Sequence, residues 1–237
     1  MSDEAFPNSE QLFKQAFATA DPAPALLKLL REHPIYDTVQ ELVIYYTEAV
    51  EEQPLRGKLL ASTLARVSVS PDAPNFETDP LASLIDRELA DQHFKVIHGN
   101  TEVKEYGPKN TYLLDSLLSG LSLKYNLTST SDQLAAIDDG LDTPSGSEKA
   151  ELLVVGACIQ LLFYGSKIVT DEAGSYKKKA STVAQKLKDH KVAGTVKNPH
   201  AVQVLELTIS NAEAGFKPED DREDAWDLLF PAEFTSR

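Results

Sequence analysis

The sequence predicts an all-α protein, built either as an irregular antiparallel helical bundle or as stacked helical pairs of the α-solenoid kind. Apolar residues recur at spacings of three and four through most of the chain, which is typical of amphipathic helices. Residues 147–165 differ, because the run from Leu152 to Tyr164 is apolar on nearly every side and is interrupted by Gly156 and Gln160. Such a helix has no face to offer water, so we expect it at the centre of the core.

In the N-terminal half, prolines separate a series of short amphipathic stretches. Helices are expected over residues 9–18, 22–33, 35–53 and 55–67, and another begins after Asp79-Pro80. The clearest apolar stripe consists of Ile35, Val39, Leu42, Val43, Tyr46 and Val50. Residues 68–78 contain two prolines and small polar residues and predict a loop. Residues 94–106 predict one short β-hairpin, because Gly99-Asn100 separates two runs that contain Val and Ile.

The second half begins with an expected helix over residues 110–125, followed by a turn-rich stretch over 126–146. We expect a single helical domain over residues 8–210, with 126–146 as a sub-boundary, and an acidic C-terminal segment over 211–237.

The central helix carries its own start and stop signals. Ser145 with Glu148 matches a capping box, and Gly165 is expected to end the helix. A buried strand through 152–157 is the alternative, since Val154 and Val155 are β-branched.

Two more segments follow the central helix. A narrow, heptad-like seam over residues 171–190 predicts a helix lying along the central one. Residues 199–210 fit a helix or a strand equally well.

Composition limits the class of partner. The net charge is -14, so non-specific binding to nucleic acid is not expected, and a charged partner should be basic. The single cysteine, Cys158, lies in the apolar run and excludes an intrachain disulfide. The first residues lack the apolar core of a secretory signal, which predicts a cytoplasmic or nuclear protein. No stretch is apolar for long enough to predict a membrane span.

Charge is distributed unevenly along the chain. Residues 1–166 carry twelve Lys or Arg against twenty-five acids, residues 167–197 carry eight against three, and residues 198–237 carry three against nine. The basic stretch should be neutralised by acids within the fold. Alternatively, the three lysines Lys177, Lys178 and Lys179 form a basic patch that binds an anionic surface.

Catalytic signatures are lacking in the sequence. No phosphate loop, dinucleotide fingerprint or paired metal-binding histidines occur, so we expect no cofactor and no metal site. The alternative is an enzyme whose inter-helical site is assembled from scattered residues such as Tyr45, Tyr46, His93 and Glu102.

The C-terminal segment carries the one motif that suggests a function. Five acids between Glu219 and Asp224 precede the only tryptophan, Trp226, which is followed by Leu229 and Phe230. The run Trp226-Asp227-Leu228-Leu229 resembles the short motif by which autophagy receptors and adaptors bind ubiquitin-like proteins of the Atg8 family. That resemblance implies Trp226 and Leu229 as anchors in two pockets, with the peptide adding a strand to the partner's sheet. It also implies Glu223 and Asp224 as charges that meet basic residues of the partner.

A fold-back arrangement is the alternative, in which Trp226, Leu229 and Phe230 pack onto the body as a hydrophobic latch. The sequence therefore favours a non-enzymatic adaptor or scaffold protein that binds another protein through an acidic, aromatic-containing C-terminal segment.

Overall fold

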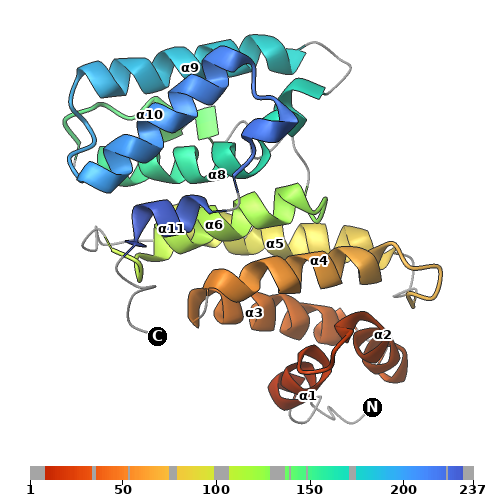
Figure 1. Ribbon diagram of the computed structural model, residues 1–237. Coiled ribbons are helices and arrows are strands. Elements are labelled where there is room, and N and C mark those ends of the chain that lie inside the picture. The colour runs from red at the N-terminus through yellow and green to blue at the C-terminus, as the bar shows by residue number, and fades with distance from the viewer. Residues whose placement is uncertain are drawn as a thin grey trace. The chain divides into compact units, whose positions relative to one another are not determined.

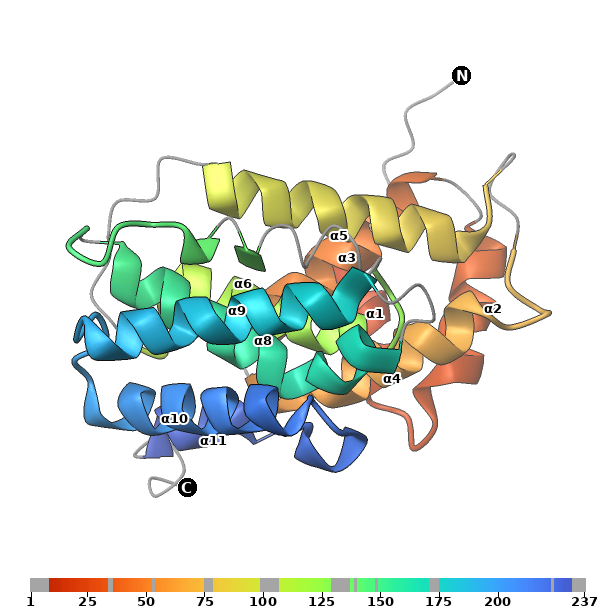
Figure 2. The same ribbon diagram turned by 90° about the horizontal axis from the view of Figure 1, so that it is seen from above.

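In the computed structural model, the elements are helices, with no β-strand among the residues described (Figures 1 and 2). The structure describes residues 9–33, 36–52, 54–74, 79–98, 107–128, 137–138, 140–147, 149–170, 175–222 and 224–231. The all-α prediction is therefore confirmed. Within the described ranges, no helix combines the length and the apolar composition that crossing a membrane requires.

Contacts divide the chain into two compact units, which are residues 1–95 with 125–128, and residues 96–124 with 129–237. The domain limits expected from the sequence, 8–210 with a sub-boundary at 126–146 and a segment over 211–237, stay predictions. The first unit holds α1 (Ser9–Phe17), α2 (Pro22–Glu32), α3 (Tyr36–Glu52), the 3-10 turn η1 (Pro54–Arg56), α4 (Gly57–Ser68) and most of α5 (Leu81–His98).

The first unit buries the apolar stripe of α3. Val39, Leu42 and Tyr46 are each fully buried, and α3 packs against both α1 and α4. The strand expected to begin at Phe94 is wrong, because α5 stays helical through His98. The rest of the expected hairpin, 99–106, lies outside the described residues.

The second unit holds α6 (Thr111–Lys124), α8 (Ala150–Thr170), α9 (Ser175–Val192), α10 (Pro199–Ala214), the 3-10 turn η2 (Pro218–Asp220) and α11 (Ala225–Leu229). The expected central helix is α8, whose side chains from Val154 to Tyr164 are all buried. Helix α8 begins at Ala150, so it does not start directly after Ser145, the expected cap. The expectation that Gly165 ends it is wrong, because α8 continues to Thr170 after a kink.

Helix α8 packs most extensively against α6, and two glycines let the backbones approach closely. A Cβ atom on Gly156 would lie 2.5 Å from Ser116 Oγ and 2.6 Å from Tyr112 Cε1. A Cβ atom on Gly120 would lie 3.2 Å from the Phe163 side chain. The small residues of this seam are therefore needed for the packing of α6 on α8.

The remaining helices cover α8. Helix α9 contacts α8, as its seam predicted, and Val183 and Leu187 are buried. Helix α10 packs on both α8 and α9, which decides between helix and strand for this segment (Figure 2). Asn198 caps its start, accepting hydrogen bonds from the amides of His200 and Ala201.

Candidate functional site

The kink in α8 forms the base of the candidate site. Tyr164 departs from helical geometry, with φ of -144° and ψ of 17°, so the hydrogen-bond ladder of the helix is interrupted there. The carbonyl of Leu162 accepts a hydrogen bond from the amide of Arg222, which belongs to the C-terminal part of the chain. The kink thus supplies a main-chain attachment point for a segment that follows α10.

That segment starts where α10 ends. The amide of Gly215 donates to the Ala212 carbonyl at 3.1 Å, and the amide of Phe216 donates to the Asn211 carbonyl at 2.8 Å. This pair of bonds is the Schellman pattern, with Gly215 in the left-handed region at φ of 88°. Phe216 is also left-handed, at φ of 49°.

Phe216 packs at the kink. A Cβ atom on Gly165 would lie 2.3 Å from Cδ1 of the Phe216 ring, so the ring occupies space that only glycine leaves open. Phe216 is 2% exposed. The contact between Gly165 and Phe216 fixes the direction in which the chain leaves α10.

Residues 216–230, the C-terminal latch, then close over α8 and α10. Helix α11 contacts both of these helices, and Trp226, Leu229 and Phe230 are 2%, 2% and 8% exposed. The rings of Trp226 and Phe230 lie 4.8 Å apart between centroids. The residues expected to bind a partner therefore face the interior, as in the fold-back alternative.

The Atg8-type motif consequently has both anchors, Trp226 and Leu229, covered in this fold. Of the two expected steering charges, Glu223 lies outside the described residues. Asp224 forms a paired contact with Arg222, with Nε to Oδ1 at 2.9 Å and Nη2 to Oδ2 at 2.6 Å. These hydrogen bonds lower the pKa of the Asp224 carboxyl below its usual value, because they favour its charged form.

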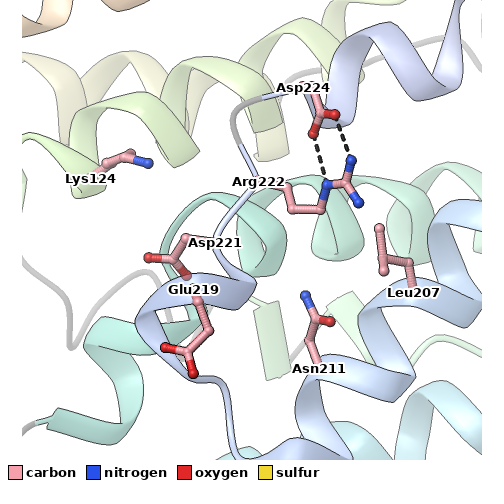
Figure 3. A pocket seen from close by; sticks show the side chains of 7 residues that line it. All are labelled: Lys124, Leu207, Asn211, Glu219, Asp221, Arg222 and Asp224. Atoms are coloured by element: carbon pink, nitrogen blue, oxygen red, sulfur yellow. Dashed lines mark hydrogen bonds and ion pairs between the residues drawn. The ribbon is translucent and has the colours of Figure 1, made fainter.

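The outer side of the latch borders an open groove of about 570 Å³ (Figure 3). Its lining is polar apart from one leucine, and consists of Lys124, Leu207, Asn211, Glu219, Asp221, Arg222 and Asp224. In Figure 3, Lys124 projects from α6 on one side, and Leu207 and Asn211 project from α10 on the other. Three of the five charged side chains are carboxylates, and all three come from the latch.

The α6 side of the groove is held by Lys167. Its Nζ atom donates to the carbonyl of Leu123 at 2.7 Å and also to the carbonyl of Lys124. Burial lowers the pKa of Lys167, while the nearby Asp221 carboxylate acts in the opposite direction. An ammonium group bound to the last carbonyls of α6 is favourable at the negative end of a helix.

The basic helix α9 pairs with acids on neighbouring segments. Lys186 lies 2.7 Å from both Asp138 and Asp142, Lys188 lies 2.8 Å from Glu213, and Lys191 lies 2.9 Å from Glu206. Neutralisation within the fold, as expected, therefore holds for these three lysines. Lys177, Lys178 and Lys179 lie in α9, and their side chains are outside what the structure describes.

The residues suggested for a scattered active site are described only in part, so that alternative stays a prediction. Tyr45 and Tyr46 are 5% and 0% exposed in α3, and the His93 side chain and Glu102 lie outside the described residues. Cys158 is fully buried, and burial raises the pKa of its thiol to about 12. Across the ranges described, no group of three or more His, Cys, Asp or Glu residues is placed to hold a metal ion.

Sequence reasoning found the acids and aromatics of the latch but missed the groove residues on α6 and α10, Lys124, Leu207 and Asn211. Lys124 is distant in sequence from the latch, and Leu207 and Asn211 lie on the preceding helix α10, so the three form no motif with it. The sequence feature that marked the base of the latch was Gly165. Its role is to make room for the Phe216 ring and not to end the helix. No protein-family model, no curated protein and no solved structure matches this chain.

Proposed function

We propose that this is a non-enzymatic protein-binding protein, and that its groove binds a basic segment of another protein. The observation that supports the proposal is that the apolar and the acidic side chains of the C-terminal latch have different surroundings. Its apolar side chains Trp226 and Leu229 are buried, whereas Glu219 and Asp221 line an open groove. Apolar residues thus hold the latch in place while its carboxylates face the position where a partner would lie.

Charge favours a cationic occupant. Arg222 lines the groove but is paired with Asp224, so two of the charges cancel locally. The Asp221 carboxylate is also close to Lys167, so Glu219, which is exposed, is the acid of the lining to which a cationic side chain would bind. The net charge of -14 also attracts basic proteins at long range and speeds their approach. An arginine or lysine side chain near Glu219, with its aliphatic part against Leu207, fits this lining.

A peptide-binding measurement tests the proposal. The probe is a fluorescent peptide of alternating arginine and leucine, and its counterpart with glutamate in place of arginine is the negative control. Fluorescence anisotropy should show saturable binding of the basic peptide alone. The double variant Glu219→Gln with Asp221→Asn should weaken that binding by about tenfold, the effect of about 1.4 kcal/mol.

The matched control is Glu52→Gln with Asp91→Asn, which removes two exposed carboxylates from α3 and α5 and changes the net charge equally. It should leave the affinity nearly unchanged. Equal weakening by both double variants would mean general charge attraction and no groove site. Absence of saturable binding to the unmodified protein would also overturn the proposal.

A further inference from the structure

Closure of the C-terminal latch requires a strained backbone conformation within the latch. Phe216 has a φ of 49°, in the left-handed region that glycine adopts readily and that a bulky aromatic residue rarely adopts. The Phe216 ring fills the space that Gly165 leaves open because it has no Cβ atom. The strain is therefore located at the residue from which the latch departs, immediately after the left-handed Gly215.

A buried polar atom adds to the cost of closure. Trp226 Nε1 on α11 is buried without a hydrogen-bond partner among the residues described. A buried donor or acceptor that lacks a partner loses its bonds to water, and exposure restores them.

The attachment of the latch to α8 combines the Arg222 amide bond to the Leu162 carbonyl with burial of apolar side chains. The paired contact between Arg222 and Asp224 lies within the latch itself and would survive its departure. Burial of Trp226, Leu229 and Phe230 thus provides the favourable term, and strain at Phe216 opposes it.

We propose that residues 216–230 open as one unit about Gly215, while α6, α8 and α10 stay folded. Opening relieves the strain at Phe216, hydrates Trp226 Nε1, and exposes Trp226 and Leu229 together. It also removes Glu219, Asp221, Arg222 and Asp224 from the groove, so the open form lacks the groove wall. This inference is independent of what the groove binds.

The chain contains one tryptophan, so Trp226 fluorescence reports on the latch alone. Urea titration of the full chain, followed by Trp226 emission and by far-ultraviolet circular dichroism, should give two transitions. The fluorescence change is expected at the lower urea concentration, because the latch opens before the helices unfold. Coincident transitions would overturn the proposal.

Two alanine variants on the same helix sharpen the test. Gly165→Ala places a methyl group in the position of the Phe216 ring and should shift the fluorescence transition to lower urea while the dichroism transition moves little. Gly156→Ala is the matched control, since its methyl group meets Tyr112 and Ser116 on α6 instead. It should shift the dichroism transition. Equal shifts of both signals in Gly165→Ala would contradict an independently opening latch.

Hydrogen exchange on the unmodified chain needs no variant. Amides in α11 should exchange together, at least about tenfold faster than the buried amides of α10, as expected for a separate opening unit. Equal protection of α11 and α10 would overturn the proposal.

Discussion

The carboxylate of Glu151, in the first turn of α8, accepts a hydrogen bond from the main-chain amide of Asn198 at 3.0 Å. The same Oε1 atom accepts the amide of Lys197 at 2.8 Å. Asn198 is in turn the residue whose side chain caps α10. One carboxylate therefore fastens the start of α10 to the start of α8.

Replacing Glu151 with alanine should lower the free energy of unfolding by about 1–3 kcal/mol, because two amides lose a charged acceptor. Glu151→Gln keeps an oxygen in the same position and should lose less. Urea denaturation followed by circular dichroism measures both. Equal losses for the two variants would show that negative charge, and not the hydrogen bonds, matters at this position.

Replacing Gln160 with leucine should be neutral or stabilising. Gln160 is 3% exposed, and its Oε1 atom has no partner among the described residues. Leucine fills similar space without a polar atom to satisfy, so a gain of up to about 1–2 kcal/mol is expected. Thermal and urea denaturation measure it. A loss above about 2 kcal/mol would instead show that the amide belongs to a polar network.

Cys158 should resist alkylation in the native protein. It is fully buried, and its thiol pKa of about 12 leaves almost no reactive thiolate at pH 8. Iodoacetamide labelling followed by mass spectrometry should therefore proceed at the rate of unfolding, and rapidly in denaturant. Rapid labelling under native conditions would mean that the packing around α8 opens far more readily than the structure implies.

Asp227→Asn should stabilise the latch at neutral pH. Burial raises the pKa of the Asp227 carboxyl, and the nearby Asp224 carboxylate raises it further. The folded state thus binds this proton more tightly than the unfolded state, so the contribution of Asp227 favours folding at low pH. It is lost as pH rises from 3.8 through the raised pKa.

The measurement for Asp227→Asn is exchange of the α11 amides, which should slow at pH 7 relative to the unmodified chain after correction for pH. Well below pH 3.8 the two proteins should behave alike, because the carboxyl is then uncharged in both states. Asp224→Asn should show the opposite pH dependence, in urea denaturation of the whole chain. The pKa of Asp224 is lowered by Arg222, so its stabilising contribution is present at neutral pH and is lost in acid. Because both residues lie within the latch, this contribution should not affect opening of the latch.

Trp226→Ala should lower the melting temperature by several degrees, because the ring is 2% exposed and packs on Phe230. Truncation of a buried aromatic side chain costs about 3–5 kcal/mol, and opening of the latch limits that loss. Trp226→Phe should retain part of the packing and lose less. An unchanged melting temperature would indicate a latch that is already open in solution.

Local pattern was sufficient for most of the helices. The stripe of α3 and the all-round apolar character of α8 correctly predicted an amphipathic and a central helix, because helical period and burial follow directly from residue spacing. The strand expected from Phe94 was wrong. Val96 and Ile97 suit a strand locally, but they continue the preceding helix α5.

By itself, the sequence determined the all-α class, the central position of α8 and the buried state of Cys158, since each follows from the spacing of apolar residues along one segment. Tertiary structure decided the rest of the site. The contact of Phe216 with Gly165, the bond from Arg222 to Leu162 and the groove between Lys124 and Asn211 each join residues far apart in the chain. Such contacts depend on which helices pack together, and packing is set by the complementarity of surfaces that no single stretch of sequence contains.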